Sequence, residues 1–291
     1  MTKMTIESAA KINLALDVTG RLPNGYHTIE SVFQTVGIYD TVTVELNGSG
    51  EITVECQTPD SFALSDPIPC DERNIAYKAA KLFFGENNLN CGCGIHIKKG
   101  IPSQAGMGGG SSDAAAVLYI LNRLTELNIS SAELADLGAR LGADVPFFLT
   151  GGTAYVSGIG EKITPIRDYS GKILVIAKGA DGVSTAEAYK SIDSLVNPTH
   201  PDVEKLLYAL KSGEDAYEFF GNIFEEAVQL KSVDEIKEKM LEGNALAAHM
   251  TGSGSAVFGM FGSLTDAEKC ASELSSEGFF AQACRTVKGS L

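Results

Sequence analysis

The stretch Ile101–Leu124, IPSQAGMGGGSSDAAAVLYILNRL, joins a glycine-rich loop to a helical pattern. Apolar residues recur after the loop at the spacing of one helix face, at Ala114, Val117, Leu118 and Leu121. Ser111 and Ser112 stand where a helix N-cap belongs, and Asp113 would follow in an acidic first turn. A glycine run at a helix start leaves backbone N–H groups open to an anion, which the helix dipole also favours. The stretch therefore predicts a phosphate site.

Two familiar phosphate loops do not fit this stretch. No lysine follows the glycines, as the GxxxxGK[ST] loop requires, and Ser111 stands where the dinucleotide fingerprint GxGxxG has its third glycine. The alternative is a flexible surface loop that is capped onto a core helix. Closely spaced glycines lose much conformational entropy on folding, so a plain connection would gain little from them. This consideration favours a ligand.

The composition limits the class of protein. The chain has 291 residues, 44% of them hydrophobic and 21% charged, which suits one large or two ordinary globular domains. A net charge of −14 disfavours nucleic acid and anionic membranes as partners, so we expect small-molecule substrates instead. A phosphorylated ligand would need local cations, and the candidates near the motifs are Lys11, Arg21, Lys98 and Lys99.

The location is expected to be cytoplasmic. No apolar run approaches the roughly 20 residues that span a bilayer, and the first residues alternate like a strand without a signal-peptide core. The six cysteines fit reduced thiols that pack in the interior. The Cys91-Gly-Cys93 pair has neither CxxC spacing nor a second pair for zinc.

Strand and helix patterns follow one another without strict alternation, which predicts an α+β fold in two packed units. The first 56 residues are expected to form short strands at 4–8, 12–18, 27–36, 41–45 and 51–56. A helix is expected at 74–84, and a capping box at Ser130–Glu133 opens another. The stretch 158–161, GIGE, is the expected boundary between a domain at 1–158 and a domain at 159–291.

Four segments resemble, in order, the motifs of the GHMP small-molecule kinases. They are AAKINLALDVTGRLPNGYH (9–27), GMGGGSSDAAA (106–116), LGADVPFF (141–148) and MTGSGSAVF (250–258). The pairing of AKINL with NGYH is similar to the branch that phosphorylates a cytidyl diphosphate ester of methylerythritol in non-mevalonate isoprenoid synthesis. The resemblance implies a two-domain GHMP kinase fold, with a left-handed βαβ crossover in the N-terminal domain and a ferredoxin-like C-terminal domain.

Lys11 and Asp144 are the expected catalytic pair. Phosphoryl transfer needs positioning, charge neutralisation and a group that accepts the proton of the attacking hydroxyl. A lysine beside an aspartate keeps the carboxylate ionised and stabilises the developing alkoxide. The resemblance places the family's catalytic lysine and aspartate on these two residues. From the residues alone, Asp144, which precedes Pro146, could equally be a plain helix N-cap, and Lys11 a strand lysine that reaches solvent.

Tyr26 and His27 are the expected base-recognition pair. An aromatic face beside an imidazole can stack a base and bond its edge, although a buried tyrosine with a satisfied histidine is the commoner use of such residues. The resemblance implies that Tyr26 stacks on cytosine and that His27 bonds its edge. The remaining substrate-binding residues implied in this way are Asn13, Phe33, Thr185 and Tyr189.

The resemblance also implies an ATP side to the site. Its residues would be Lys99, Gly106, Gly108, Gly109, Gly110, Ser111 and Ser112 around the phosphates, and Asn74 and Ile75 near the adenosine. The turn at 252–255 would close the site from the second domain, although a tight turn between two strands explains it equally well. No protein ligand is assigned to Mg²⁺, which is expected mainly on the phosphates of ATP, the co-substrate.

Two departures from the family pattern stand beside these matches. Ser103-Gln-Ala replaces glycines that precede the loop in some members, and Lys178-Gly-Ala-Asp stands where a proline-containing segment is common. Other activities stay open at this point. They are another GHMP kinase that acts on mevalonate, homoserine or a sugar, and a non-catalytic member that binds nucleotide. The protein is expected to be a monomer or homodimer.

Overall fold

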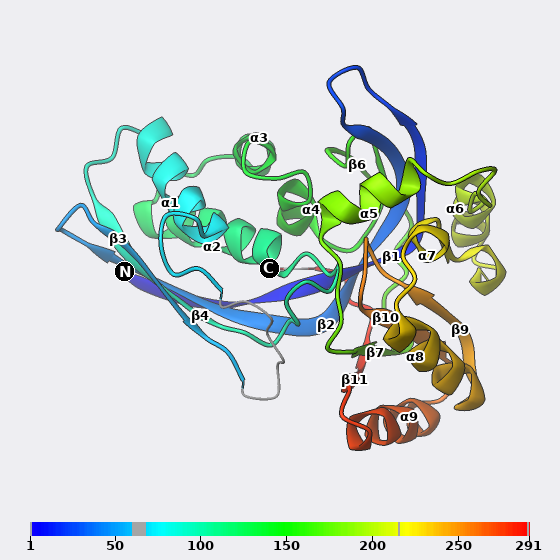
Figure 1. Ribbon diagram of the computed structural model, residues 1–291. Coiled ribbons are helices and arrows are strands. Elements are labelled where there is room, and N and C mark those ends of the chain that lie inside the picture. The colour runs from blue at the N-terminus through cyan, green and yellow to red at the C-terminus, as the bar shows by residue number, and fades with distance from the viewer. Residues whose placement is uncertain (1, 60–67, 215, 290) are drawn as a thin grey trace.

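Two β-sheets and the helices packed on them make up the α+β structure (Figure 1). The computed structural model describes residues 2–59, 68–214, 216–289 and 291. Within these residues one sheet has seven strands and the other has four. The two sheets correspond to the two packed units expected from the sequence.

Two long antiparallel strands, β1 (Lys3–Arg21) and β2 (His27–Asn47), form the centre of the larger sheet. The sequence pattern predicted four shorter strands here, and this division is wrong. Register shifts in the β1–β2 pairing, for example between Asn13 and Ala15, interrupt the alternation of side chains without ending the strands. Such irregularities bend a long ribbon, and they look like strand ends in the sequence.

Shorter strands complete this sheet. They are β3 (Ile52–Gln57), β4 (Gly92–Lys98), β5 (Thr153–Ser157), β6 (Lys162–Pro165) and β8 (Gly221–Asn222). The order is β3-β4-β2-β1-β8, while β5 pairs with β2 and β6 with β5. β3 and β4 are parallel, as a βαβ unit around α1 (Ile75–Glu86) requires. The expected boundary at residue 158 lies inside the β5–β6 hairpin, so the larger sheet continues past it. The division of the chain into two domains at this residue stays a prediction.

Four helices cover one face of the larger sheet (Figure 1). Beside α1 lie α2 (Gly109–Thr125), α3 (Ser131–Ala139) and α4 (Val145–Thr150). The predicted apolar face of α2 is confirmed, because all four of its residues are fully buried. The predicted capping box of α3 is also confirmed, with Ser130 and Glu133 each bonding the other's backbone.

The smaller sheet has the ferredoxin-like arrangement. Its strands are β7 (Ile173–Lys178), β9 (Ala245–Met250), β10 (Val257–Phe261) and β11 (Phe280–Arg285). Their spatial order is β11-β7-β10-β9, all antiparallel, with α8 (Lys231–Glu242) and α9 (Leu264–Ser276) in the two long connections. This is the βαββαβ pattern that the family resemblance implied.

The remaining elements connect the two sheets. They are α5 (Thr185–Ile192), α6 (Val203–Ser212), α7 (Phe224–Ala227) and a 3₁₀ turn at Tyr217–Phe219. No helix in the described part of the chain has the length and apolar character needed to cross a membrane. All six cysteines are free, and two of them, Cys93 and Cys270, are buried.

One apolar core joins the two sheets. It contains Ile12 and Leu14 from β1 together with Phe258 and Met260 from β10. Phe258 is fully buried, and its ring lies 6.1 Å from that of Phe220. The relative placement of the sheets, and hence of any site between them, therefore depends on this shared core.

We expect Phe258→Ala to lower the free energy of unfolding by about 3–5 kcal/mol, because it leaves a cavity in the shared core. Urea denaturation measures this loss. Tyr208→Ala is the matched control, since Tyr208 is 68% exposed and its truncation should change stability by less than about 0.5 kcal/mol. Equal losses in the two variants would show that the shared core does not hold the sheets together.

Candidate active site

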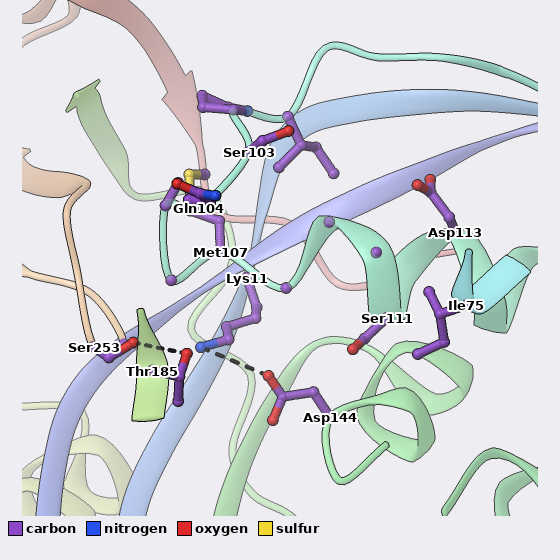
Figure 2. Close-up of a pocket in the computed structure, with 18 of the residues that line it drawn as sticks. Lys11, Ile75, Ser103, Gln104, Met107, Ser111, Asp113, Asp144, Thr185 and Ser253 are labelled. Carbon is purple, nitrogen blue, oxygen red and sulfur yellow. Dashed lines mark hydrogen bonds and ion pairs between the residues drawn. The ribbon is translucent and has the colours of Figure 1, made fainter. Parts of the chain in front are cut away.

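A cavity of about 570 Å³ opens where β1, the glycine loop, α4, α5 and the turn after β9 meet (Figure 2). Most of the residues predicted from the sequence line it: Lys11, Asn13, Phe33, Asn74, Ile75, Lys99, Gly106, Gly108, Gly109, Gly110, Ser111, Asp144, Thr185 and Tyr189. Ser112, Tyr26 and His27 do not line it. The structure thus brings together residues from all four sequence motifs.

The start of α2 differs from the prediction. The helix begins at Gly109, and Gly108, in the left-handed region at φ +72°, occupies the N-cap position. Ser111 and Ser112 are therefore inside the first turns rather than at the cap, and Asp113 lies beyond the first turn. Glycine adopts this φ at no steric cost, so the helix can begin here without a capping side chain. Gly109, Gly110 and Ser111 of the first turn still line the cavity, and the first N–H groups of a helix have no partner within it, as an anion site requires.

Ser112 is not placed to bind phosphate. Its side chain is fully buried, and its hydroxyl donates to the carbonyl of Ala9 at 2.7 Å. Its backbone N–H donates to the carbonyl of Gly108 at 2.9 Å. Both of its donors thus serve the protein, so this predicted contact is corrected. Ser111 remains a cavity residue, on the side of α2 that faces Asp144 (Figure 2).

The glycine loop lies against the turn that follows β9. A Cβ on Gly106 would stand 2.1 Å from the carbonyl oxygen of Thr251 and 3.0 Å from the Cα of Gly252. Gly106 also has φ +70°, which L side chains rarely adopt. Only glycine fits here, so the turn at 251–252 is more than a local connection between two strands. Together with the glycine loop it lines the cavity, through Gly252 and Ser253.

Lys11 and Asp144 face each other across the cavity (Figure 2). The Lys11 ammonium lies 4.0 Å from the Asp144 carboxylate, and the Lys11 side chain is only 4% exposed. Burial lowers the pKa of Lys11, and the Asp144 carboxylate opposes that shift. The alternative that Lys11 reaches solvent is therefore wrong. Its ammonium also lies 4.6 Å from the ring centre of Phe33.

Asp144 occupies the N-cap position of α4 without acting as a side-chain cap. The predicted helix start before Pro146 is confirmed, but the Asp144 carboxylate makes no capping hydrogen bond. Its side chain is 32% exposed and faces the cavity. A carboxylate that is held by the helix start but is not consumed by it remains available to a ligand.

Asn13 connects Lys11 to the turn after β9. Its side-chain oxygen accepts from the Lys11 ammonium at 2.7 Å, from the Thr251 hydroxyl at 3.1 Å and from the Gly252 N–H at 3.0 Å. Its amide nitrogen donates to the Ser31 hydroxyl at 2.9 Å. These hydrogen bonds fix Lys11 and the turn relative to each other. The contact of Asn13 with substrate hydroxyls stays a prediction.

Lys99 makes two ion pairs inside the protein. Its ammonium bonds the carboxylate of Asp40, on β2, and that of Asp113, on α2, the latter at 2.7 Å. The other oxygen of Asp40 accepts the N–H groups of Gly100 and Ile101, at 2.7 and 2.8 Å. Sequence reasoning assigned Lys99 to the phosphates and missed both carboxylates. Lys99 does line the cavity. The two carboxylates neutralise most of its charge, so its main role is to anchor the loop.

The charge state of this cluster follows from its burial. Two carboxylates share one ammonium, and Asp40 is fully buried. Burial raises the pKa of Asp113 to about 8, assisted by Asp40 and opposed by Lys99. The two carboxylates raise the pKa of Lys99 against the effect of its burial. The raised pKa of Asp113 favours an extra proton on this cluster, and that proton brings the cluster closer to electroneutrality.

Of the residues predicted to bind a base, Phe33 and Tyr189 line the cavity, and His27 packs on Tyr189 outside it. The ring of His27 stacks on that of Tyr189, with centroids 4.8 Å apart and planes 20° from parallel. Burial, with Asp144 nearby, raises the pKa of Tyr189 to about 12. Tyr26 is 61% exposed and outside the cavity, and its stacking on a base stays a prediction. Phe33 lies beneath Lys11 and packs edge-on against Phe147 at 5.3 Å, as a core residue does.

The predicted adenosine side lies at the start of α1. Asn74 caps this helix by accepting the Ala76 N–H at 2.9 Å, and its amide donates to the carbonyl of Pro69 at 2.7 Å. Ile75 and the unpredicted Arg73 stand beside it at the cavity rim. At the opposite rim, the hydroxyls of Thr185 and Ser253 lie 3.2 Å apart (Figure 2).

Comparison with known proteins gives concordant results. The family described as GHMP kinases N terminal domain matches residues 74–152, and GHMP kinases C terminal matches residues 192–279. A 4-diphosphocytidyl-2-C-methyl-D-erythritol kinase of Clostridium botulinum (strain Eklund 17B / Type B) is 41% identical over 273 residues, which cover 92% of this chain and 94% of that protein.

Solved structures agree with these matches. A crystal structure of 4-(cytidine 5'-diphospho)-2C-methyl-D-erythritol kinase is similar with a TM-score of 0.81 and 31% identity, covering 98% of this chain and all of the other. A homoserine kinase from Cytophaga hutchinsonii has a TM-score of 0.76 at 16% identity, over 100% of this chain and 96% of that one. The second likeness shows the fold alone.

We expect Lys99→Met to lower the free energy of unfolding by about 3–5 kcal/mol, because it leaves buried carboxylates without their cation. Asp113→Asn is the matched variant. It keeps the shape of the carboxyl group, and the raised pKa of Asp113 favours the neutral form that the amide imitates, so near pH 7 it should cost much less. Urea denaturation of both variants measures the difference. Similar losses in the two would contradict the proposed charge state.

We expect Gly106→Ala to weaken the binding of ATP on the order of 100-fold, because the added Cβ moves the glycine loop away from the turn at 251–252. Isothermal titration calorimetry measures this change. Gly85→Ala is the control, since a Cβ there meets nothing within 4 Å and the residue lies in α1. Unchanged affinity in Gly106→Ala would show that the close approach does not shape the site.

Proposed function

The chain belongs to the GHMP kinases, within them to the 4-diphosphocytidyl-2-C-methyl-D-erythritol kinases, and we propose how its cavity carries out that reaction. The protein is an ATP-dependent kinase that phosphorylates the 2-hydroxyl of 4-diphosphocytidyl-2-C-methyl-D-erythritol in the non-mevalonate route to isoprenoids. The assignment of individual residues to steps of this reaction is our proposal, and the arrangement of Lys11 and Asp144 is the observation that carries it.

Asp144 acts as the general base. Its carboxylate, which faces the cavity and makes no capping bond, accepts the proton of the 2-hydroxyl as that oxygen attacks the γ-phosphorus. The bond from the γ-phosphorus to the β–γ bridging oxygen breaks, and ADP leaves with that oxygen. Lys11, whose ammonium lies 4.0 Å from the Asp144 carboxylate, stabilises negative charge on the attacking oxygen. Asn13 holds the lysine in place for this step.

The triphosphate lies along the glycine loop and the start of α2. The N–H groups of the first helical turn and the helix dipole supply positive potential, while the glycines let the phosphates approach the backbone. Ser111 lies at the same rim. Lys99 supports this cradle from below by joining the loop, β2 and α2 through Asp40 and Asp113.

Magnesium fits this site as an ion that is bound to the phosphates of ATP. In the described part of the chain, no group of three or more His, Cys, Asp or Glu side chains could hold a metal ion. We therefore propose that Mg²⁺ is bound mainly by the phosphates, where it neutralises their charge. Ser111 and Asp144 are two oxygen-bearing side chains of the cavity that would add to its coordination.

The acceptor lies at the end of the cavity lined by Tyr189 and Thr185, with His27 stacked on Tyr189 beside it. The stacked pair of His27 and Tyr189 suits the cytosine ring, and Tyr26, on the neighbouring exposed turn, would have to move inward to cover the base. The Thr185 hydroxyl, bonded to Ser253, suits the polar part of the acceptor. Mevalonate, homoserine and sugars carry no base, so this end of the cavity disfavours them as acceptors.

Asp144→Asn should lower kcat by about 100- to 10,000-fold, because a carboxamide cannot accept the proton of the hydroxyl. The affinities for ATP and for the acceptor should change little, since the shape of the side chain is preserved. ADP release in the presence of Mg²⁺ measures turnover, and calorimetry measures binding.

Asp136→Asn is the control, because Asp136 is exposed on α3. Substantial activity in Asp144→Asn would contradict the assignment of the base. The wild-type protein is assayed in parallel with the cytidyl substrate, mevalonate, homoserine and galactose. Turnover with another acceptor would retain Asp144 but reject the base-binding end, and ATP binding without any turnover would favour a non-catalytic role.

A further inference from the structure

Asp193, directly after α5, joins two basic side chains of the β1–β2 hairpin. One carboxylate oxygen lies 2.8 Å from Nε2 of His27, and the other lies 3.0 Å from Nη1 of Arg21. The backbone N–H of Asp193 completes the last turn of α5 by donating to the carbonyl of Tyr189. The side chain of Asp193 thus contacts the hairpin through both of its oxygens. None of the four sequence motifs contains Asp193.

This contact determines where His27 carries its proton. The hydrogen bond from His27, together with the charge of Arg21, holds the pKa of Asp193 below its usual range, so the carboxylate is ionised near neutral pH. An ionised carboxylate can only accept hydrogen bonds, so Nε2 of His27 must be the donor. In a neutral imidazole the other nitrogen, Nδ1, is then an acceptor.

Nδ1 of His27 is also accessible. Among the described residues it has no hydrogen-bond partner, and no buried side-chain nitrogen or oxygen there lacks one, so Nδ1 must reach solvent. The orientation of the ring is fixed by its stacking on Tyr189, which lines the cavity. A single acceptor nitrogen is thus held in a fixed plane beside the proposed base-binding end.

We propose that Asp193 is a positioning residue that fixes Nδ1 of His27 as an acceptor, and thereby selects an acceptor substrate with cytosine over one with uracil. The inference rests on the proposed function, in which His27 meets the edge of the base. Cytosine presents an amino group at position 4, a donor that matches this acceptor. Uracil presents a carbonyl oxygen there, and its lone pairs would face that of Nδ1.

The variant Asp193→Asn tests this role, because Arg21 can only donate. The new amide turns its oxygen toward Arg21 and its NH₂ toward His27. Nε2 must then accept, so the proton moves to Nδ1, which becomes a donor. The preference for cytosine over uracil should fall about 10-fold or more, with kcat/KM for the uridyl substrate rising in absolute terms.

The double variant Arg21→Met with Asp193→Asn is the matched control. Without Arg21 the amide can turn its oxygen back toward His27, so the preference for cytosine should recover in part. The ratio of kcat/KM for the cytidyl substrate and its uridyl analogue is measured in the wild type and both variants. Nitrogen-15 NMR of the His27 imidazole reports the tautomer directly, which a merely structural role of Asp193 would leave unchanged.

The outcomes separate this inference from the proposed function. A wild type that turns over the cytidyl substrate, while Asp193→Asn keeps the wild-type ratio and tautomer, would overturn the role of Asp193 and leave the kinase reaction intact. Equal use of both bases by the wild type would also overturn it. An inactive wild type with the cytidyl substrate would instead reject the proposed function. A lowered ratio that recovers in the double variant supports the inference.

Discussion

A buried ammonium group, that of Lys11, is the constraint on which the rest of the site depends. Desolvation makes an isolated charge in the interior costly, so the protein must supply partners for it. The side-chain oxygen of Asn13 accepts a hydrogen bond from the ammonium. The Asp144 carboxylate lies 4.0 Å from the ammonium and the centre of the Phe33 ring lies 4.6 Å from it. Each partner comes from a different part of the chain, so the requirement to satisfy one cation brings β1, β2 and α4 together.

The partners of Lys11 also connect the two sheets. Asn13, on β1, bonds the turn at 251–252 that follows β9, and that turn lies directly against Gly106. The glycine loop, Lys11 and the smaller sheet are therefore one packed unit. A change in how the sheets sit would alter the distance between the glycine loop and Asp144. In-line phosphoryl transfer tolerates little such change, because it relies on positioning.

In two further clusters near the cavity, a basic side chain is likewise paired with carboxylates from distant parts of the chain. Beside the glycine loop, Lys99 is enclosed by Asp40 and Asp113, which fixes the loop against β2 and α2. Beside Tyr189, Asp193 is shared by Arg21 and the ring nitrogen of His27. In both clusters, a carboxylate from a distant part of the chain decides how a predicted site residue can act. A lysine becomes an anchor, and a histidine acquires a defined acceptor.

Local chemistry explains what the sequence by itself determined about this protein. Helix periodicity, the capping box at Ser130–Glu133 and the closely spaced glycines act over a few residues, so the helices, the glycine loop and the family motifs could be identified without coordinates. The ferredoxin-like order of the second sheet followed from the resemblance. The true extent of β1 and β2 did not, because register shifts imitate strand ends.

Only the tertiary structure decided which side chains meet. Asp40 reaches Lys99 because β2 and β4 pair with Thr41 opposite Lys98, and Asp193 reaches His27 because α5 lies beside the hairpin. The family resemblance placed Ser112 in the site, yet in the structure its hydroxyl donates to the backbone carbonyl of Ala9. Such contacts depend on strand register and on packing between distant segments, which no pattern within a few residues can specify.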